Sequence, residues 1–476
     1  MNHLLPQGPY SVEKDDGWRT LLTTAPSDRY YRNPGMGLIG YTWEENGPSL
    51  AVRNGKLQLE QFVERMASSP YVDALYIRCD WRDVQRAPGK LSLSPVWRLT
   101  LDAARKYKLP VGFRVQLSSP NFQPKQLAAP DFIQERVPFV KIGRKPNLEF
   151  DYREPQYDHP AFLTAFQELN DLLAAEFDGD PTIEYMDLMM YGFWGEGHSS
   201  GLPHPFADDI TAERTMTRMA EMQLEAWKRT QLVVNMQTDI SRVGNVRVQE
   251  MAISEGHWAR VDSIIVEEPW GIEQLASRPQ ATGLIVEDGT HRHYDSSRIP
   301  VLPSGMNALE DAMKHAADVG GQYWALWTEE DQFAAFDEAN PAAIPALRRR
   351  LGYRVRPAWI WQRIRGEGDE LVVAVANDGA GGIPGRLRIV AESLDGRYRE
   401  GGLLAPGEPA GGRVKLVSFL LPPEMSGQVI ALRAELELRP GLARPVRWCC
   451  EPVSAEDGGL HVKLHRHDEP GWRKNI

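Results

Sequence analysis

The chain has 476 residues and a net charge of −11, and its hydrophobic (42%) and charged (25%) fractions are ordinary for a folded protein that buries a large core. The acidic balance argues against a nucleic-acid partner, because phosphate binding needs a basic surface. No apolar run approaches the roughly 18 residues of a membrane span, so no membrane partner is expected.

Cysteine usage and the N-terminal sequence bear on the compartment. The three cysteines, Cys79, Cys449 and Cys450, form no CxxC pair and imply no disulfide framework. Residues 1–17 lack the long apolar segment of a signal peptide. These features predict a cytoplasmic protein, or a secreted one from which a signal peptide has been removed.

Short apolar runs alternate with amphipathic stretches from residue 37 to residue 327, the pattern of βα units around a parallel sheet. We expect strands at 37–41, 74–78, 110–115, 183–190, 232–235, 263–266, either 283–286 or 299–302, and 322–327. Helices are expected at 95–108, 158–177, 213–229, 246–255 and after Asn307. Eight such units predict a (β/α)₈ TIM barrel over residues 1–353, with an N-terminal extension.

The pattern changes near Arg354, where helical periodicity gives way to strict alternation. Between Ile430 and Leu438 every second residue is apolar, and a similar run around Val373 precedes a turn. Alternation of this kind is typical of antiparallel sheets that are buried on one face. We therefore predict a second domain, a C-terminal antiparallel β-sandwich, over residues 354–476.

In a barrel of this kind, function collects where the strands end. The polar and aromatic residues that follow the predicted strands are therefore the candidate substrate-binding residues. They are Arg78, Asp80, Trp81, Arg114, Gln116, Trp194, His198, Asn235, Trp270 and Trp327. Together with nearby carboxylates they are suited to a carbohydrate, because tryptophan faces stack on sugar rings and paired carboxylates cleave glycosidic bonds.

Glu196 is the strongest catalytic candidate. It follows the fourth predicted strand, between Trp194, Gly195 and Gly197. An aromatic wall at this position is expected to raise the pKa of the carboxyl group, as a general acid requires near neutral pH. His198 is interpreted as a hydrogen-bonding partner rather than a catalyst.

A second carboxylate is needed, and two residues compete for the role. Glu268 lies close to Trp270, which suits a sugar pocket, and the intervening Pro269 fixes the turn. Glu287 follows the run 283–286, which is the seventh strand only if 299–302 is not. Glu268 is the preferred assignment. Residues His291 and His293 are a weak metal signal, so neither a metal nor another cofactor is expected.

Three segments carry a resemblance to a known group. They are residues 74–90 with Arg78 and Trp81, the segment 191–198 (YGFWGEGH), and the opening 33–37 (NPGMG). The first is similar to β-galactosidase-type barrel glycosidases, and the others resemble uncharacterised glycosidase-like barrels with a C-terminal β-domain. The resemblance implies an acid/base glutamate after strand four, matched by Glu196, and a nucleophile after strand seven. It also implies the tryptophan of strand eight, matched by Trp327.

The sequence therefore predicts a glycoside hydrolase in which Glu196 is the acid/base and Glu268 or Glu287 is the second carboxylate. A non-catalytic carbohydrate-binding barrel is the main alternative. A metal-dependent hydrolase is a third, and it predicts that chelators abolish activity. The sequence contains no signal for the oligomeric state.

Overall fold

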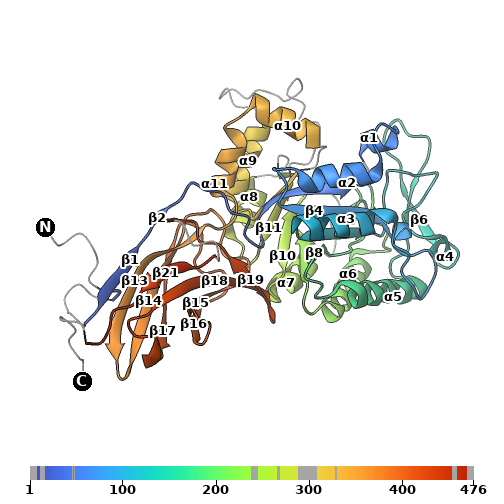
Figure 1. Ribbon diagram of the computed structural model, residues 1–476. Coiled ribbons are helices and arrows are strands. Elements are labelled where there is room, and N and C mark those ends of the chain that lie inside the picture. Colours follow the sequence, from blue (N-terminus) through green and yellow to red (C-terminus); the bar gives the residue numbers. More distant parts are fainter. Residues whose placement is uncertain are drawn as a thin grey trace.

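The computed structural model describes residues 8–10, 17–44, 47, 49–236, 245–264, 269–287, 308–326, 330–452 and 458–468. Within these ranges eight parallel strands follow one another around a closed barrel (Figure 1). The strands are β3 (Gly37–Trp43), β4 (Ala74–Asp80), β5 (Val111–Gln116), β8 (Ile183–Asp187), β9 (Gln231–Asn235), β10 (Trp258–Val261), β11 (Leu284–Glu287) and β12 (Tyr323–Leu326). The predicted TIM barrel is confirmed.

Helices cover the outside of the barrel and bury their apolar faces against the strands. The helices are α1 (Leu50–Arg53), α2 (Leu59–Ser68), α3 (Pro95–Tyr107), α4 (Asp131–Gln134), α5 (Pro160–Phe177), α6 (Asp209–Ala226), α7 (Asn245–Ser254), α8 (Pro269–Ser277), α9 (Ala308–Asp318), α10 (Glu330–Ala339) and α11 (Ala343–Arg350). In α5 the predicted stripe of Phe162, Phe166, Leu169 and Leu173 is buried. None of the described helices combines the length and apolarity needed to cross a bilayer.

The sixth barrel strand lies earlier in the chain than predicted. It is β10, Trp258–Val261, and not 263–266. The error has a physical cause: Arg260 interrupts the apolar run, but inside the barrel its charge is paired with carboxylates. The seventh strand, β11, agrees with the prediction at 283–286. The alternative at 299–302 lies outside the described residues.

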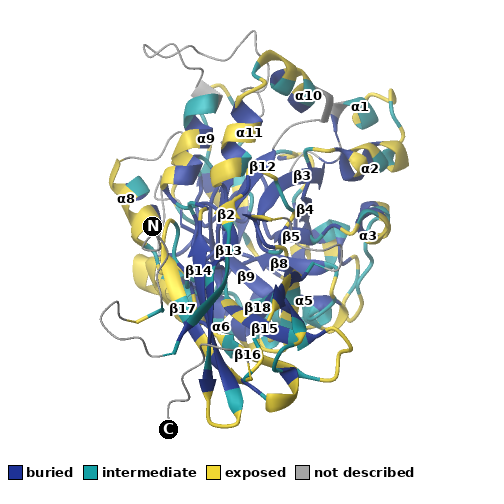
Figure 2. Ribbon diagram, turned by 60° about the vertical axis from the view of Figure 1, so that its left-hand side comes forward, coloured by how far each residue is buried: buried dark blue, intermediate teal, exposed yellow. Residues whose placement is uncertain are grey.

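Antiparallel sheets follow the barrel, as the alternating sequence predicts. One sheet has the order β1 (Arg19–Thr23), β13 (Val355–Arg365), β14 (Gly368–Asn377) and β17 (Val414–Leu421). The other has the order β16 (Arg399–Leu403), β15 (Arg386–Ser393), β18 (Val429–Arg439) and β19 (Leu442–Val446), with β21 (Leu460–Lys463) also on β18. Side chains of both sheets enter one buried cluster. The ribbons of β13 and β14 are largely dark blue in Figure 2, the colour of buried residues. The N-terminal strand β1 therefore belongs to this region.

Two short pairs complete the described strands. They are β2 (Ala25–Pro26) with β20 (Cys450–Glu451), and β6 (Phe139–Gly143) with β7 (Tyr152–Pro155). The second pair is inserted between β5 and α5.

The antiparallel sheets contact the barrel at the end where its strands begin. Arg444 of β19 lies 3.3 Å from Glu184, near the start of β8. The amide of Gln322, just before β12, donates to the carbonyl of Gly382. The opposite end of the barrel, where the strands finish, carries the residues described next. The predicted division at residues 353 and 354 stays a prediction, and β13 begins at Val355.

Candidate active site

Three arginines lie inside the barrel. Side chains alternate along a strand, so Ile77 and Cys79 join the hydrophobic layer beneath the helices and Arg78 between them points inward. Arg114 of β5 and Arg260 of β10 are equally buried, and none of the three is more than 1% exposed. Buried guanidinium groups need charged partners, and four acidic side chains provide them.

Arg78 contacts three carboxylates at once. Its Nη1 lies 3.5 Å from Oε1 of Glu196, and its Nη2 lies 3.4 Å from Asp262 and 3.2 Å from Oε2 of Glu287. Glu196 follows barrel strand four, Asp262 follows strand six, and Glu287 ends strand seven. One guanidinium group thus links the ends of three strands, and it brings two predicted catalytic residues into one cluster.

Arg114 and Arg260 extend this network. Arg114 lies 3.2 Å from Glu196, 3.3 Å from Asp262 and 3.5 Å from Asp187. Arg260 lies 3.1 Å from Asp187 and 3.2 Å from Glu287. Burial alone lowers the pKa of a guanidinium group, but the carboxylates, led by Asp262 for Arg114 and by Asp187 for Arg260, outweigh it and raise both pKa values. Both arginines therefore stay charged.

The carboxylate of Glu287 is contacted by three donor groups. Its Oε2 accepts a hydrogen bond of 2.7 Å from the hydroxyl of Tyr41 and contacts both Arg78 and Arg260. Burial, followed by the charge of Glu287, raises the pKa of Tyr41 well above its ordinary value. Tyr41 therefore remains a donor, and the carboxylate is surrounded by groups that favour its charged form.

The loop that carries Glu196 is a compact turn built on glycines. Its backbone closes through bonds from Phe193 N–H to the His198 carbonyl and from Gly197 N–H to the Tyr191 carbonyl. Gly192 has φ +80°, and a Cβ there would lie 2.1 Å from the His198 carbonyl oxygen, so only glycine fits.

The Glu196 carboxylate has cationic and donor groups on both oxygens. Oε1 lies near Arg78 and Arg114, and Oε2 lies 3.0 Å from Nε2 of His198. The Ser200 N–H donates to Nδ1 of His198, so the neutral ring carries its proton on Nε2 and donates it to Glu196. Trp194 of the same loop contacts the His198 ring edge to face.

A second buried carboxylate supports this loop from below. Glu154 of β7 is fully buried and accepts 2.6 Å hydrogen bonds from the hydroxyls of Ser118 and Tyr157. The Gly192 N–H bonds to the same group and to the Tyr157 hydroxyl. Burial raises the pKa of Glu154 from its ordinary 4.5 to about 7, although these three bonds lower it.

This raised pKa predicts that stability depends on pH through Glu154. The folded protein binds the proton more tightly than the unfolded chain, so the contribution of Glu154 to stability is largest below pH 4.5 and is lost as the pH rises to about 7. At roughly 1.4 kcal/mol per pKa unit, the loss is about 3 kcal/mol. Urea unfolding from pH 4.5 to 8 should show this fall in the wild type relative to Glu154→Gln. Parallel stability profiles for the two proteins would contradict it.

The other predicted polar residues lie at or near this end of the barrel. Asn235, the last residue of β9, donates to Asp262 at 2.5 Å and to the backbone carbonyl of Glu196 at 3.3 Å. Asp80 and Gln116 end two neighbouring strands, are register partners, and are both buried. The structure thus brings most of the predicted polar set together.

The predicted tryptophans do not share one location. Trp81 is not a sugar platform, because it is fully buried among Phe132 and Phe162 beneath the helices. The strand ends at Asp80, and the chain then turns outward. Trp270 is exposed at the start of α8. The predicted residues Glu268 and Trp327 lie outside the described residues.

Several members of the network are absent from the predicted set. They are Tyr41, Tyr76, Asp187, Arg260 and Asp262. Asp187 was included in a longer fourth strand, and Asp262 preceded the misplaced sixth strand. The alternation of side chains along a correctly placed strand identifies both as inward-facing.

No group of three His, Cys, Asp or Glu side chains suited to a metal ion occurs in the described part of the chain. The predicted pair His291 and His293 lies outside it.

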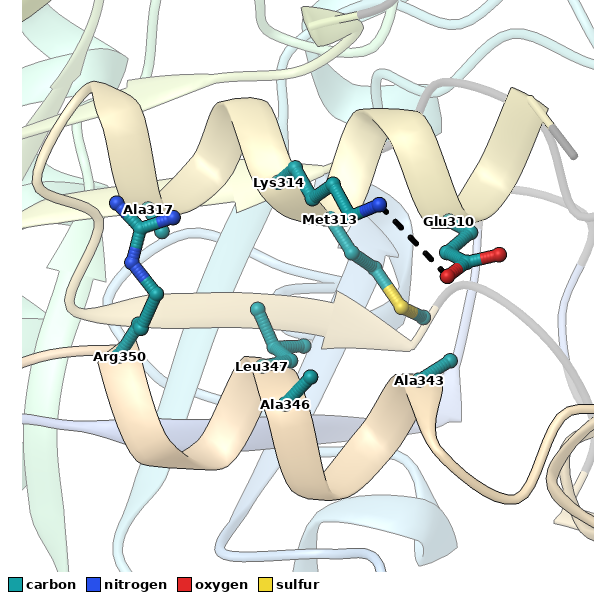
Figure 3. Close-up of a pocket in the computed structure, with 8 residues that line it drawn as sticks. All are labelled: Glu310, Met313, Lys314, Ala317, Ala343, Ala346, Leu347 and Arg350. Carbon is teal, nitrogen blue, oxygen red and sulfur yellow. Dashed lines mark ion pairs between the residues drawn. The ribbon is translucent and has the colours of Figure 1, made fainter. Parts of the chain in front are cut away.

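A cavity of about 140 Å³ lies between α9 and α11, away from the barrel interior (Figure 3). Met313 and Leu347 contribute apolar surface to it, and Lys314 pairs with Glu310 at 3.8 Å, so it lacks the convergent polar groups of the barrel interior.

Solved structures with a similar arrangement include endo-glycoceramidase II from Rhodococcus sp. in complex with ganglioside GM3, at 12% identity over 83% of this chain and 99% of the other, with a TM-score of 0.40. The lactosyl-enzyme intermediate of endo-glycoceramidase II from the same source has 14% identity over the same shares, with a TM-score of 0.37. A D-allulose 3-epimerase from Methylomonas sp. has 11% identity over 68% of this chain and 100% of the other, with a TM-score of 0.33.

These scores do not assign a function to this chain, because all three TM-scores lie below 0.5. No protein-family model and no curated protein matches the sequence. The fold itself is a closed parallel barrel followed by antiparallel sheets, as the sequence predicts.

Proposed function

We propose that this protein is a retaining glycoside hydrolase in which Glu287 is the nucleophile and Glu196 is the acid/base. One observation carries the proposal: Glu196 and Glu287 follow barrel strands four and seven and contact the same guanidinium group, that of Arg78. These are the two positions that the resemblance to retaining barrels implies. Glu287 is preferred to Glu268 because it ends a barrel strand and belongs to the cluster.

The separation of the two carboxylates is compatible with this chemistry. Their oxygens lie 3.5 and 3.2 Å from the two nitrogens of Arg78. Because those nitrogens are only about 2.3 Å apart in a planar guanidinium group, the carboxylate oxygens are at most about 9 Å apart. Two-carboxylate glycosidases use separations of roughly 5–5.5 Å when they retain configuration and 6.5–9.5 Å when they invert it.

The roles follow from the surroundings of each group. An oxygen of Glu287, kept ionised by Tyr41, Arg78 and Arg260, attacks the anomeric carbon as the glycosidic C–O bond breaks. The leaving oxygen takes a proton from Glu196. Water then attacks the same carbon, gives its proton to Glu196, and releases Glu287.

Glu196→Gln should lower turnover at least about 10²-fold, because it removes general acid–base catalysis. The loss should be largest for glycosides with poor leaving groups, which depend most on protonation. Hydrolysis of a series of aryl glycosides by the purified variant measures both effects. Near wild-type turnover of a poor leaving group would contradict the assignment.

A non-catalytic carbohydrate-binding barrel is the second candidate. It is favoured by the arginines, which contact Glu196 and Glu287 and give the cluster the character of a structural network. A panel of 4-nitrophenyl glycosides and oligosaccharides separates the candidates. Sugar-induced thermal shifts without any hydrolysis would support the binding barrel.

A further inference from the structure

Gln116 is a buried amide without a hydrogen-bond partner among the described residues. It is 0% exposed, and neither its Oε1 nor its Nε2 forms a hydrogen bond. Other buried glutamines in the described ranges are bonded: Gln223 bonds to the backbone of Met189 and Met219, and Gln322 bonds to Gly382 and Leu284. A buried polar group without a hydrogen bond is costly, so the unpaired amide of Gln116 lowers the stability of the folded protein.

The position of Gln116 directs its amide to the inside of the barrel, at the end where the strands finish. It ends β5 two residues after Arg114, so alternation gives the two side chains the same inward direction. Val115 between them joins the layer beneath the helices. Gln116 also lies beside the catalytic loop, because a Cβ on Gly195 would be 3.9 Å from its Cα.

The chemistry of the site selects the kind of ligand. The amide offers two donors and an acceptor, which an apolar group would leave unpaired. An anion is disfavoured, because four carboxylates already face three guanidinium groups among the described side chains. A neutral pair of adjacent hydroxyl groups satisfies both amide atoms: one hydroxyl donates to Oε1 and the other accepts from Nε2.

We infer that Gln116 binds two adjacent hydroxyl groups of the sugar ring whose anomeric carbon lies between Glu196 and Glu287. The inference rests on the proposed function and adds a residue that determines which sugars are accepted. A sugar lacking either hydroxyl would leave half of the buried amide unpaired.

The test couples changes in the protein to changes in the sugar. Wild type and Gln116→Leu, which removes both polar atoms at similar volume, are assayed with 4-nitrophenyl β-D-glucoside, β-D-galactoside and β-D-mannoside and with the monodeoxy derivatives of the best substrate. In the wild type, removal of either of two adjacent hydroxyls should lower kcat/KM roughly 5- to 150-fold, the factor for leaving one buried polar group unpaired. In Gln116→Leu those two penalties should vanish while the others remain.

Stability provides a second readout and a matched control. Gln116→Leu should keep its Tm within about 2 °C of the wild type or raise it, because no protein hydrogen bond is lost. Gln223→Leu is the control, because it removes hydrogen bonds between the Gln223 amide and the backbone of Met189. It should lower Tm by at least about 3 °C. Equal destabilisation by the two substitutions would show that Gln116 is a structural residue and would overturn the inference.

The remaining outcomes distinguish this inference from the proposed function. If no glycoside is hydrolysed, binding of D-glucose, D-galactose, D-mannose and their deoxy forms is followed by saturation-transfer NMR. If removal of either hydroxyl weakens binding to the wild type but not to Gln116→Leu, and no glycoside is hydrolysed, the hydrolase is refuted and the inference is supported. Hydrolysis with deoxy penalties unchanged in Gln116→Leu, as for an amide that binds only water, overturns the inference and leaves the hydrolase standing. Neither binding nor hydrolysis overturns both.

Discussion

Glu287→Ala is expected to lower kcat at least about 10³-fold, because the substitution removes the group that forms the covalent intermediate. The carboxylate ends β11 and is held ionised by Tyr41, Arg78 and Arg260. Alanine leaves a space lined by these donors, into which a small anion fits. Sodium azide, an anionic nucleophile, should therefore restore part of the turnover and yield a glycosyl azide of inverted configuration, identified by NMR.

Asp262→Asn is the matched control for this variant. Like Glu287→Ala, it removes one negative charge that contacts Arg78 and Arg260. Unlike that variant, it leaves the proposed nucleophile in place. We expect its activity loss to be at least about tenfold smaller than that of Glu287→Ala, since charge removal alone spares covalent catalysis. Azide should not rescue it. Equal losses in both variants, with no rescue of either, would mean that Glu287 is only a member of the ionic network.

Arg78→Met is expected to destabilise the protein by about 3 kcal/mol and to abolish measurable hydrolysis. Removing one partner from a buried ionic network usually costs about 3–5 kcal/mol. The lower end applies because Arg114 still pairs with Glu196, and Arg260 with Glu287. Activity should fall further than stability explains, because Arg78 is the group that holds the two catalytic carboxylates relative to each other. Denaturant unfolding and kcat/KM, measured on the folded fraction, separate the two effects.

Arg82→Met is the control for loss of an arginine at a nearby position. Arg82 pairs at 3.1 Å with Asp131, whose side chain is 84% exposed. Pairs of this kind contribute roughly 0–1 kcal/mol, so stability and activity should be close to those of the wild type. An Arg78→Met protein as stable and active as Arg82→Met would show that the buried network is not formed in solution.

The barrel could be predicted because apolar strands alternate with amphipathic helices, a pattern that local sequence carries. Strand β10 could not be predicted in this way, because the charged Arg260 interrupts its apolar run. Only the tertiary pairing of Arg260 with Asp187 and Glu287 makes a charge acceptable inside a barrel. The role of the N-terminal strand β1 was equally inaccessible, since its partner β13 lies more than 300 residues away in sequence.

The site was predicted in part, for a similar reason. Position after a strand identified Arg78, Arg114 and Glu196, which do meet. The same rule placed Trp81 at the site, although the chain turns outward there and buries the ring. The arginines that contact Glu196 are distant from it in sequence, so local sequence could not identify this pairing.

Trapping of the covalent intermediate tests the central proposal most directly. The 2-deoxy-2-fluoro derivative of the best aryl glycoside, carrying a dinitrophenyl leaving group, is incubated with the wild type and with Glu287→Ala, and the protein is digested and analysed by mass spectrometry. We expect one fluoroglycosyl group to be attached to the peptide containing Glu287 and the variant to remain unlabelled. Attachment to another carboxylate, or turnover with inversion and no adduct, would contradict it.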